Sequence, residues 1–248
     1  MSTQSKNTSI FADVVLIDID GTITAPIRNK DFAVSPLEQL LRLLMQSESI
    51  SREAALAKIR QIGDVETSCI FKFLEPLGIS AELYWNLLRQ DVKEGMMIPE
   101  DAVFFIKALK SKNIKLFSAT TNSRMATLLK LSVGGLGDIN GSPHFDGYFG
   151  GDSFADPLGK WSPEFFPSIL KAGRFDPKRT LMIGDDPERD MLPALQAGIA
   201  HVAIIDRHQQ ETILDKDGVL FINSLNPLYH MLKPASMHIC QRVGSDPR

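Results

Sequence analysis

The sequence predicts an α/β fold in which a doubly wound parallel sheet carries a second, all-α domain as an insertion. Residues 14–19 form a nearly unbroken apolar run, which is typical of a strand buried on both faces of a parallel sheet. Strand and helix patterns alternate between residues 98 and 232, as expected where helices connect parallel strands. Residues 23–97 show amphipathic helix patterns and little strand pattern, so this segment interrupts the sheet domain.

The sheet domain is predicted from apolar runs bounded by turn signals. Its strands are expected at 14–19, 114–120, 148–149, 180–183, 200–205 and 219–222. Its helices are expected at 100–112, from about 122, at 162–172, at 188–196 and at 225–232.

Serine caps indicate where the inserted helices begin. The string SPLE at 35–38 is a capping box with proline at the first helical position. Ser51 and Ser80 precede two further helices, and Gly95 ends the last of them. The later helices of this segment are expected at 51–62, 65–77 and 81–94.

These patterns divide the chain into two domains and two tails. The α/β core is predicted over 12–22 and 98–232, and the helical domain over 23–97. The polar ends, 1–11 and 233–248, are predicted to be disordered.

Composition excludes several classes of protein. The 27 basic and 30 acidic side chains give a net charge of −3, so nothing indicates a nucleic-acid partner. No apolar run approaches the roughly 18 residues that a membrane span requires. The N-terminus lacks the basic and apolar regions of a secretory signal, and the two cysteines lie far apart in the sequence. We therefore expect a cytoplasmic protein without a membrane partner.

Acidic residues follow two of the predicted strands. Asp18 and Asp20 close the first strand, and the string GDDPERD at 184–190 follows the strand at 180–183. The carboxyl ends of parallel strands meet at one edge of a sheet, which brings these acids together. Carboxylates about 4 Å apart repel by about 4 kcal/mol per pair at an effective dielectric near 20, so they require a cation. All-oxygen ligands favour a hard divalent ion, and Mg²⁺ is the predicted cofactor.

The same edge of the sheet has the features of a phosphate site. Gly21 permits a tight turn that exposes backbone N–H groups. Thr120, Thr121 and Asn122 stand where a strand ends and a helix begins, and Lys160 precedes another helix. An ionised aspartate near pH 7 is a nucleophile that needs no activating base.

Four motifs in order resemble the haloacid dehalogenase-like hydrolase superfamily. They are the string DIDGT at 18–22, Thr120, Lys160 with a proline three residues later, and the string GDDPERD at 184–190. The resemblance extends over residues 13–230. It implies a Rossmann-like core, and the helical insertion resembles the α-helical cap of this superfamily.

The resemblance implies a role for each motif residue. Asp18 would attack phosphorus and form an aspartyl-phosphate, and Asp20 would act as general acid and then general base. Thr120 would bind the phosphoryl oxygens, although Thr121 is an open alternative one residue away. Lys160 would orient Asp18 and offset negative charge. Gly21, Thr121 and Asn122 are the predicted substrate-binding residues.

The resemblance also implies a ligand set for the metal. Mg²⁺ would be held by Asp18, the backbone carbonyl of Asp20, and Asp185. Asp186 and Asp190 remain alternatives for the supporting acid.

The residue at position 20 narrows the activity that the resemblance implies. Dehalogenases of the superfamily replace this second aspartate, so Asp20 indicates a phosphatase or a phosphomutase. Mutases of the β-phosphoglucomutase type carry a histidine soon after the first motif, and residues 23–40 contain none. The predicted function is hydrolysis of a small phosphorylated metabolite. The alternatives are a phosphomutase and a non-catalytic binding protein with the same fold.

Overall fold

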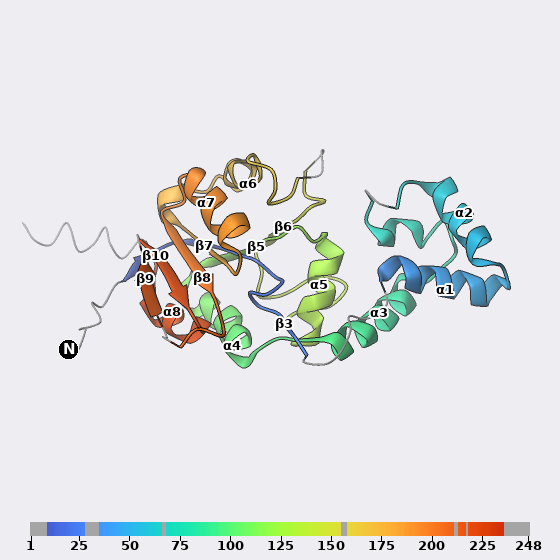
Figure 1. Ribbon diagram of the computed structural model, residues 1–248, viewed down its shortest axis with the longest axis horizontal. Coiled ribbons are helices and arrows are strands. Elements are labelled where there is room, and N and C mark those ends of the chain that lie inside the picture. The colour runs from blue at the N-terminus through green and yellow to red at the C-terminus, as the bar shows by residue number, and fades with distance from the viewer. Residues whose placement is uncertain are drawn as a thin grey trace, which may run out of the picture.

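A seven-stranded sheet forms the centre of the computed structural model (Figure 1). The structure describes residues 9–27, 35–65, 68–154, 158–210, 213–216 and 218–235, without the side chains of 214–216. Of the predicted tails at 1–11 and 233–248, residues 1–8 and 236–248 lie outside the described residues. In the order β6-β5-β2-β7-β8-β10-β9, the strands are Gly147–Phe149, Lys115–Ala119, Val14–Ile17, Thr180–Gly184, His201–Ile205, Val219–Ile222 and Ile213–Lys216.

The strand pairing confirms the predicted doubly wound parallel sheet. The chain runs outward from β2 through β5 to β6, then returns to β7 on the other side of β2 and continues through β8 to β10. These pairs are parallel, whereas the edge strand β9 runs antiparallel to β10. Strand β9 was not predicted from the sequence.

Helices cover both faces of this sheet, which explains the apolar character of β2. Val14 and Leu16 pack with the buried side chains of α6 (Phe165–Gly173) and α7 (Leu192–Gln196). Val15 and Ile17 belong to the core on the opposite face, with residues of α4, α5 and α8. Those helices span Glu100–Leu109, Arg124–Val133 and Leu225–Met231. A strand covered on both faces has no side that can be polar.

The sheet register aligns the ends of the three central strands. Ile17 of β2 pairs with Ser118 of β5 and with Ile183 of β7. The residues that follow these positions therefore leave the sheet at the same edge, where ligands bind in open α/β sheets.

The inserted helices begin at the predicted serine caps. They are α1 (Pro36–Glu48), α2 (Arg52–Ile62) and α3 (Ala81–Gly95). The hydroxyls of the preceding serines accept the backbone N–H of Glu38, Ala54 and Leu83 respectively. Such caps satisfy N–H groups that have no partner within the helix.

The inserted helices lie beside the core, beyond α5, at the right of Figure 1. Helix α3 packs along α5, and Arg89 donates hydrogen bonds from Nε to Ser132 Oγ and from Nη2 to Ser132 O, each at 3.2 Å. The segments leading into and out of the insertion pair as short antiparallel strands, β3 (Ala25–Pro26) and β4 (Met96–Met97). The exact domain boundaries stay a prediction.

Two predicted helices are shorter than expected, and each contains a proline. In the described part of 65–77, only a 3₁₀ turn forms, at Ile70–Phe73. Pro76 has no N–H to donate to the carbonyl of Lys72. The predicted helix at 188–196 begins instead as a π-helical turn (Pro187–Met191) before α7, since Pro193 cannot bond four residues back.

The prediction of disordered tails was wrong for residues 10, 11 and 233, which form strands. Strand β1 (Ile10–Phe11) pairs in parallel with β11 (Leu232–Lys233), and Ala12 donates its N–H to the carbonyl of Lys233 at 3.0 Å. Ile10 is buried, so its apolar side chain stabilises this pairing. No helix in the described part of the chain has the length and apolar character needed to cross a membrane.

Candidate active site

The loop after β2 places Asp18 at the centre of the sheet edge. Asp18 is buried and donates its backbone N–H to the carbonyl of Ile183 at 2.9 Å. The chain then turns tightly, because Ile23 and Thr24 both donate their N–H groups to the carbonyl of Ile19. The sequence analysis predicted a turn at this position.

Gly21 is required at this turn for two reasons. Its φ of +72° is a conformation that other residues adopt only with strain. A Cβ atom at this position would lie 2.0 Å from Oδ2 of Asp185. The turn can therefore approach the second acidic loop only with glycine.

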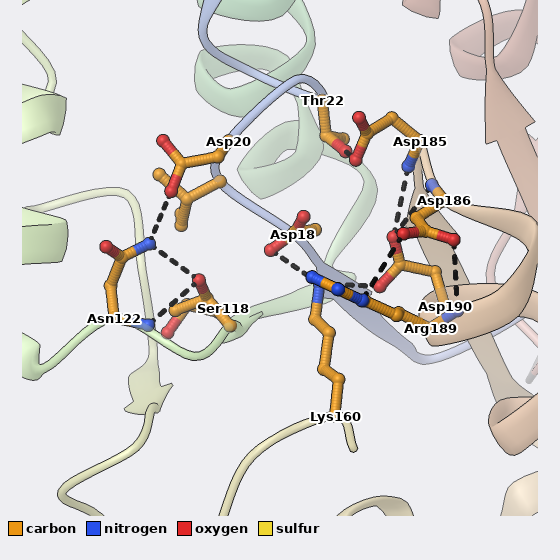
Figure 2. A network of polar contacts seen from close by, with 12 residues as sticks. Asp18, Asp20, Thr22, Ser118, Asn122, Lys160, Asp185, Asp186, Arg189 and Asp190 are labelled. Carbon is orange, nitrogen blue, oxygen red and sulfur yellow. Dashed lines mark hydrogen bonds and ion pairs between the residues drawn. The ribbon is translucent and has the colours of Figure 1, made fainter. Parts of the chain in front are cut away.

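Lys160 joins two of the predicted acids (Figure 2). Its Nζ lies 2.7 Å from Oδ1 of Asp18 and 2.5 Å from Oδ1 of Asp190. Both partners are buried, as is Lys160 itself. Burial lowers the pKa of Lys160, but the two carboxylates outweigh this effect and raise the pKa above its ordinary value. The ammonium group is thus held charged between the two loops.

The acidic loop after β7 is organised by Asp190. Oδ2 of Asp190 accepts the backbone N–H groups of Asp185 and Asp186, each at 3.1 Å. A Cβ on Gly184 would lie 2.2 Å from this carboxylate, so glycine is sterically required at position 184. Asp190 therefore fixes the direction of Asp185 as well as facing Lys160.

Asp186 has a different role from its neighbours. Its Oδ1 accepts the N–H groups of Glu188 and Arg189 at 2.8 and 3.2 Å, and so caps the helical turn that follows. The group of acids that could hold a metal consists, among the described residues, of Asp18, Asp185 and Asp190. Of the two supporting acids predicted as alternatives, the geometry favours Asp190.

Charge balance in this group fits a divalent cation. One carboxylate oxygen from each of the three acids lies within 4.8 Å of the other two, and Lys160 supplies one positive charge among them. Burial raises the pKa of Asp18 to about 7; Lys160 opposes this rise and Asp190 adds to it. Burial and Asp190 also raise the pKa of Asp185. An all-oxygen site with excess negative charge is suited to Mg²⁺.

Asp20 lies apart from this group. Its carboxylate points away from Asp18 and Asp185 in Figure 2. It accepts a hydrogen bond from Nδ2 of Asn122 at 2.8 Å. Lys130 contacts both carboxylate oxygens, at 2.7 and 2.6 Å. Burial raises the pKa of Asp20, but Lys130 and Asn122 outweigh it and hold the pKa below its ordinary value.

Lys130 is a site residue that the sequence did not predict. It lies on α5, and its Nζ also donates to Oδ1 of Asn122 at 2.9 Å. A lysine within a helix of mixed polarity gives no sign of a partner 110 residues earlier in the chain. Only the packing of α5 beside the loop after β2 reveals this contact.

Of the three predicted phosphate-binding residues after β5, two line the cavity that contains Asp18 and one does not. Thr120 is buried, and its Oγ1 accepts the backbone N–H and the Nδ2 of Asn122 at 3.3 and 2.8 Å. Thr121 is exposed, and both threonines line the cavity that contains Asp18, so the alternative between them stays open. Asn122 does not line this cavity; its side chain contacts Asp20, Thr120 and Lys130 instead.

The cavity has a volume of about 320 Å³. Its lining residues are Asp18, Asp20, Gly21, Thr120, Thr121, Lys160, Asp185, Asp186, Arg189 and Asp190. Arg189 was not predicted, although it lies within the GDDPERD string; its exposed guanidinium adds positive charge at the cavity mouth.

The buried lysine and three acids lie at the carboxyl edge of a parallel sheet, where ligands bind in open α/β folds, so the site is that of an α/β protein that binds a cation and an anionic ligand. The chain belongs to the haloacid dehalogenase-like hydrolases, because the family model for these proteins matches residues 12–198. This result confirms the superfamily that the four motifs predicted. A comparison with curated proteins finds no match.

Solved structures show the same fold at low sequence identity. A HAD phosphatase from Thermococcus onnurineus is 21% identical, with a TM-score of 0.51 and coverage of 88% of this chain and 96% of its own. A putative HAD-hydrolase from Bacillus subtilis, solved bound to magnesium, is 18% identical, with a TM-score of 0.51 and coverage of 89% and 98%. A 2-haloacid dehalogenase from Pseudomonas syringae is 17% identical, with a TM-score of 0.52 and coverage of 89% and 98%.

Proposed function

We propose that this protein is a Mg²⁺-dependent phosphatase that hydrolyses a small phosphomonoester through an aspartyl-phosphate on Asp18. The observation that carries the proposal is the buried contact of Lys160 with Asp18 and Asp190, beside Asp185. Lys160 directs one oxygen of Asp18, and the excess of carboxylates provides the ligands for a hard cation. Asp18, Asp185 and the backbone carbonyl of Asp20 would hold Mg²⁺, with Asp190 in support. When bound, Mg²⁺ supplies positive charge that neutralises the carboxylates and the phosphate dianion.

The first half-reaction transfers the phosphoryl group to the protein. An oxygen of Asp18 forms a bond to phosphorus while the bond from phosphorus to the ester oxygen breaks. Asp20 must be protonated at this step, and its proton passes to the departing oxygen, which leaves as an alcohol. Lys130 and Asn122 favour the ionised form of Asp20, which is the form that the second half-reaction uses. The backbone N–H groups at the Gly21 turn and the hydroxyl of Thr120 or Thr121 bind the phosphoryl oxygens.

The second half-reaction releases phosphate. Asp20, now ionised, accepts a proton from water as the water oxygen bonds to phosphorus. The bond between phosphorus and Asp18 breaks, which restores both aspartates to their starting states. The sum of both steps is ester plus water giving alcohol plus phosphate.

The arrangement around Asp20 favours a phosphatase over a dehalogenase. A halide departs as a stable anion and needs no proton, whereas an alkoxide does. Asp20 lines the same cavity as Asp18 and is held by two side chains, as a residue that serves the leaving group requires. A phosphomutase would use the same two aspartates, so product analysis must separate transfer from release.

A second cavity indicates what kind of alcohol the substrate carries. This cavity, of about 440 Å³, shares Thr121 with the acidic cavity. Phe71 and Leu88 line it from the inserted segment, and Leu129 and Trp161 line it from the core. Asp152 is the charged side chain among the described residues that line it, so a second anionic group on the substrate would be repelled. These features support a small phosphomonoester with an uncharged, largely apolar alcohol portion.

The proposal concerns a small metabolite rather than a macromolecule, because the inserted helices stand beside the cavity. We place the reaction in the cytoplasm, because the chain has two cysteines and they lie far apart in the sequence.

Hydrolysis assays test this function directly. Phosphate release from p-nitrophenyl phosphate and from a panel of alkyl, aryl, sugar and nucleoside monophosphates is measured with Mg²⁺ and with excess chelator. Wild type should be active only with the cation, and Asp18→Asn should lose activity by roughly 10³-fold or more. Glu82→Gln removes the same charge from an exposed position in the first turn of α3 and should match wild type. Activity that survives Asp18→Asn or chelation would falsify the proposed mechanism.

The same panel tests the substrate class and the alternatives. Alkyl and aryl phosphates should give higher kcat/KM than sugar phosphates, and Phe71→Ala should reduce this preference. Transfer of phosphate to a second hydroxyl without release would identify a mutase, and halide release from a 2-haloacid would identify a dehalogenase.

A further inference from the structure

Lys130, Asp20 and Asn122 form a closed ring of polar contacts. Lys130 Nζ contacts both oxygens of Asp20 and donates to Oδ1 of Asn122, while Nδ2 of Asn122 donates to Asp20 Oδ2. The same Nδ2 group lies 2.8 Å from Thr120 Oγ1. The polar atoms of the Asn122 side chain are therefore used within this network, and the ring is tied to the cavity wall.

Asp20 needs such a ring because its side chain is otherwise free. Its carboxylate side chain is 57% exposed, unlike that of Asp18, which is 9% exposed. The backbone on either side is fixed by buried Ile19 and by the Gly21 turn, but this leaves two side-chain torsions unrestrained. An unrestrained carboxylate at this position would be drawn toward positive charge beside Asp18.

Lys130 is held firmly enough to direct another residue. Its side chain is 21% exposed, and it projects from a helix whose neighbouring residues Leu128, Leu129 and Leu131 are buried in the core. Helix α5 is also capped by Ser123, whose hydroxyl accepts the N–H of Ala126 at 3.3 Å. Lys130 thus links Asp20 to helix α5, on the side of Asp20 that faces away from the three acids of the candidate metal site.

We propose that Lys130 is a positioning residue for the reaction: with Asn122 it holds the Asp20 carboxylate at the cavity wall, apart from Asp18, Asp185 and Asp190, where it can reach the leaving oxygen. This inference rests on the proposed phosphatase function. In an in-line displacement the nucleophile and the leaving oxygen lie on opposite sides of phosphorus. Asp18 and Asp20 must therefore be kept apart, although they are two residues apart in sequence.

The variants Lys130→Met and Lys130→Arg test this role. Lys130→Met removes the charge but keeps most of the length, and Lys130→Arg restores a cation that can contact both oxygens. Arg124→Met is the matched control, because Arg124 projects from the same helix toward Asn140 and Tyr148 rather than Asp20. Thermal unfolding of each variant shows whether it is folded.

Kinetics with a simple alkyl phosphate should separate positioning from binding. Lys130→Met should lower kcat by roughly 10- to 100-fold while KM changes less than about 3-fold, since general acid–base catalysis contributes roughly 10²- to 10⁴-fold. Lys130→Arg should recover most of this loss, and Arg124→Met should be unaffected. The p-nitrophenolate leaving group needs little protonation. With p-nitrophenyl phosphate, Lys130→Met should therefore slow formation of the aspartyl-phosphate less than it does with an alkyl phosphate.

A double variant shows whether Lys130 acts through Asp20. In an Asp20→Asn background, Lys130→Met should lower kcat by less than about 2-fold, because the group it positions is already absent. Unchanged kcat in Lys130→Met, or an equal loss in both backgrounds, would overturn the proposal. If wild type is active while Lys130→Met equals it, this inference fails and the phosphatase function stands.

A crystal structure of Lys130→Met provides a readout independent of activity. The Asp20 carboxylate should leave its position beside Asn122 in this variant and keep it in Lys130→Arg. An unmoved Asp20 in Lys130→Met contradicts the proposal even if wild type proves inactive on every phosphate ester tested. If Lys130→Met does not fold, Lys130→Gln takes its place in both experiments.

Discussion

Arg207 donates a hydrogen bond from Nη2 to the backbone carbonyl of Thr22 at 3.0 Å, which ties the loop after β2 to the segment after β8. The Nη1 group of the same arginine lies 2.9 Å from both oxygens of Asp101, at the start of α4. Asp101 in turn accepts the N–H of Leu225 and the hydroxyl of Ser224, at the start of α8. The loop that carries Asp18 is thus braced by residues outside the active site.

Replacing Arg207 should lower the stability of the fold. Arg207→Met leaves the half-buried Asp101 without its ion partner and removes the donor to Thr22. We expect a loss of about 2–4 kcal/mol in the free energy of unfolding, measured in urea. Arg207→Lys should recover only part of this loss, because the ammonium group of lysine cannot reproduce the planar guanidinium, which contacts Asp101 and Thr22 at the same time. A stability equal to that of wild type in Arg207→Met would show that this brace is unimportant.

The Asp101 network also predicts a dependence of stability on pH. Burial raises the pKa of Asp101, but the Leu225 N–H and Arg207 outweigh it and hold the pKa below its ordinary value of 3.8. A group with a lowered pKa binds fewer protons in the folded state than in the unfolded state. Its stabilisation is therefore complete above the unfolded pKa and is lost as pH falls through the folded pKa.

The comparison of wild type with Asp101→Asn measures this effect. The difference in unfolding free energy should be constant between about pH 7 and pH 5, and should shrink as pH falls below about 4. A difference in unfolding free energy that grows as the pH falls would contradict a lowered pKa of Asp101. Chemical denaturation at several pH values provides the measurement.

The close approach of Gly21 to Asp185 predicts a large effect from one added methyl group. Gly21→Ala introduces a Cβ 2.0 Å from Oδ2 of Asp185 and strains a backbone with φ of +72°. We expect loss of most Mg²⁺ binding and activity, since Asp185 must move. Gly135→Ala is the control: its φ is +66°, but no atom lies within 4 Å of the added Cβ.

Gly135→Ala isolates the backbone strain, which costs roughly 1–2 kcal/mol. It should therefore lower stability without changing kcat or Mg²⁺ affinity. Calorimetric titration of Mg²⁺ and steady-state kinetics on both variants make the comparison. Equal effects of the two substitutions on Mg²⁺ affinity would rule out the steric explanation.

Asp190 and Asp186 should differ sharply when replaced. Asp190→Ala removes the partner of Lys160 and the acceptor for two backbone N–H groups, so Mg²⁺ binding and activity should fall by roughly 10²-fold or more. Asp186→Ala removes a cap and should cost about 1 kcal/mol of stability, with activity within a few fold of wild type. The opposite ranking in Mg²⁺ titrations would assign the supporting role to Asp186.

The elements that position Asp18 could be predicted because their signals are local. The apolar run of β2, the acids that follow it and the alternation of strands and helices are all visible within short windows of sequence. Adjacent strand ends in a parallel sheet then bring Asp18 and Asp185 together without further information. Lys160 could be predicted as a candidate because it precedes a helix, but its contact with Asp18 was implied only by the resemblance to the superfamily.

The missed features depend on contacts between distant segments. Strands β1 and β11 are two residues long, too short to give a pattern, and they pair across most of the chain. Lys130 reaches Asp20 only because α5 packs with one particular rotation beside the loop after β2. The helix expected at 65–77 is a different kind of error, because Pro76 is visible in the sequence and disfavours a helical turn directly before it.

Detection of phosphate on Asp18 itself tests whether the reaction passes through an aspartyl-phosphate. Asp20→Asn is mixed with p-nitrophenyl phosphate and Mg²⁺, quenched in acid within one turnover, digested and analysed by mass spectrometry. A good leaving group lets the aspartyl-phosphate form without the acid, and loss of the base slows its hydrolysis. We expect a phosphorylated peptide containing Asp18, and we expect it to be absent from the double variant Asp18→Asn/Asp20→Asn. Phosphate on another residue, or turnover without any phosphorylated peptide, would contradict an aspartyl-phosphate on Asp18.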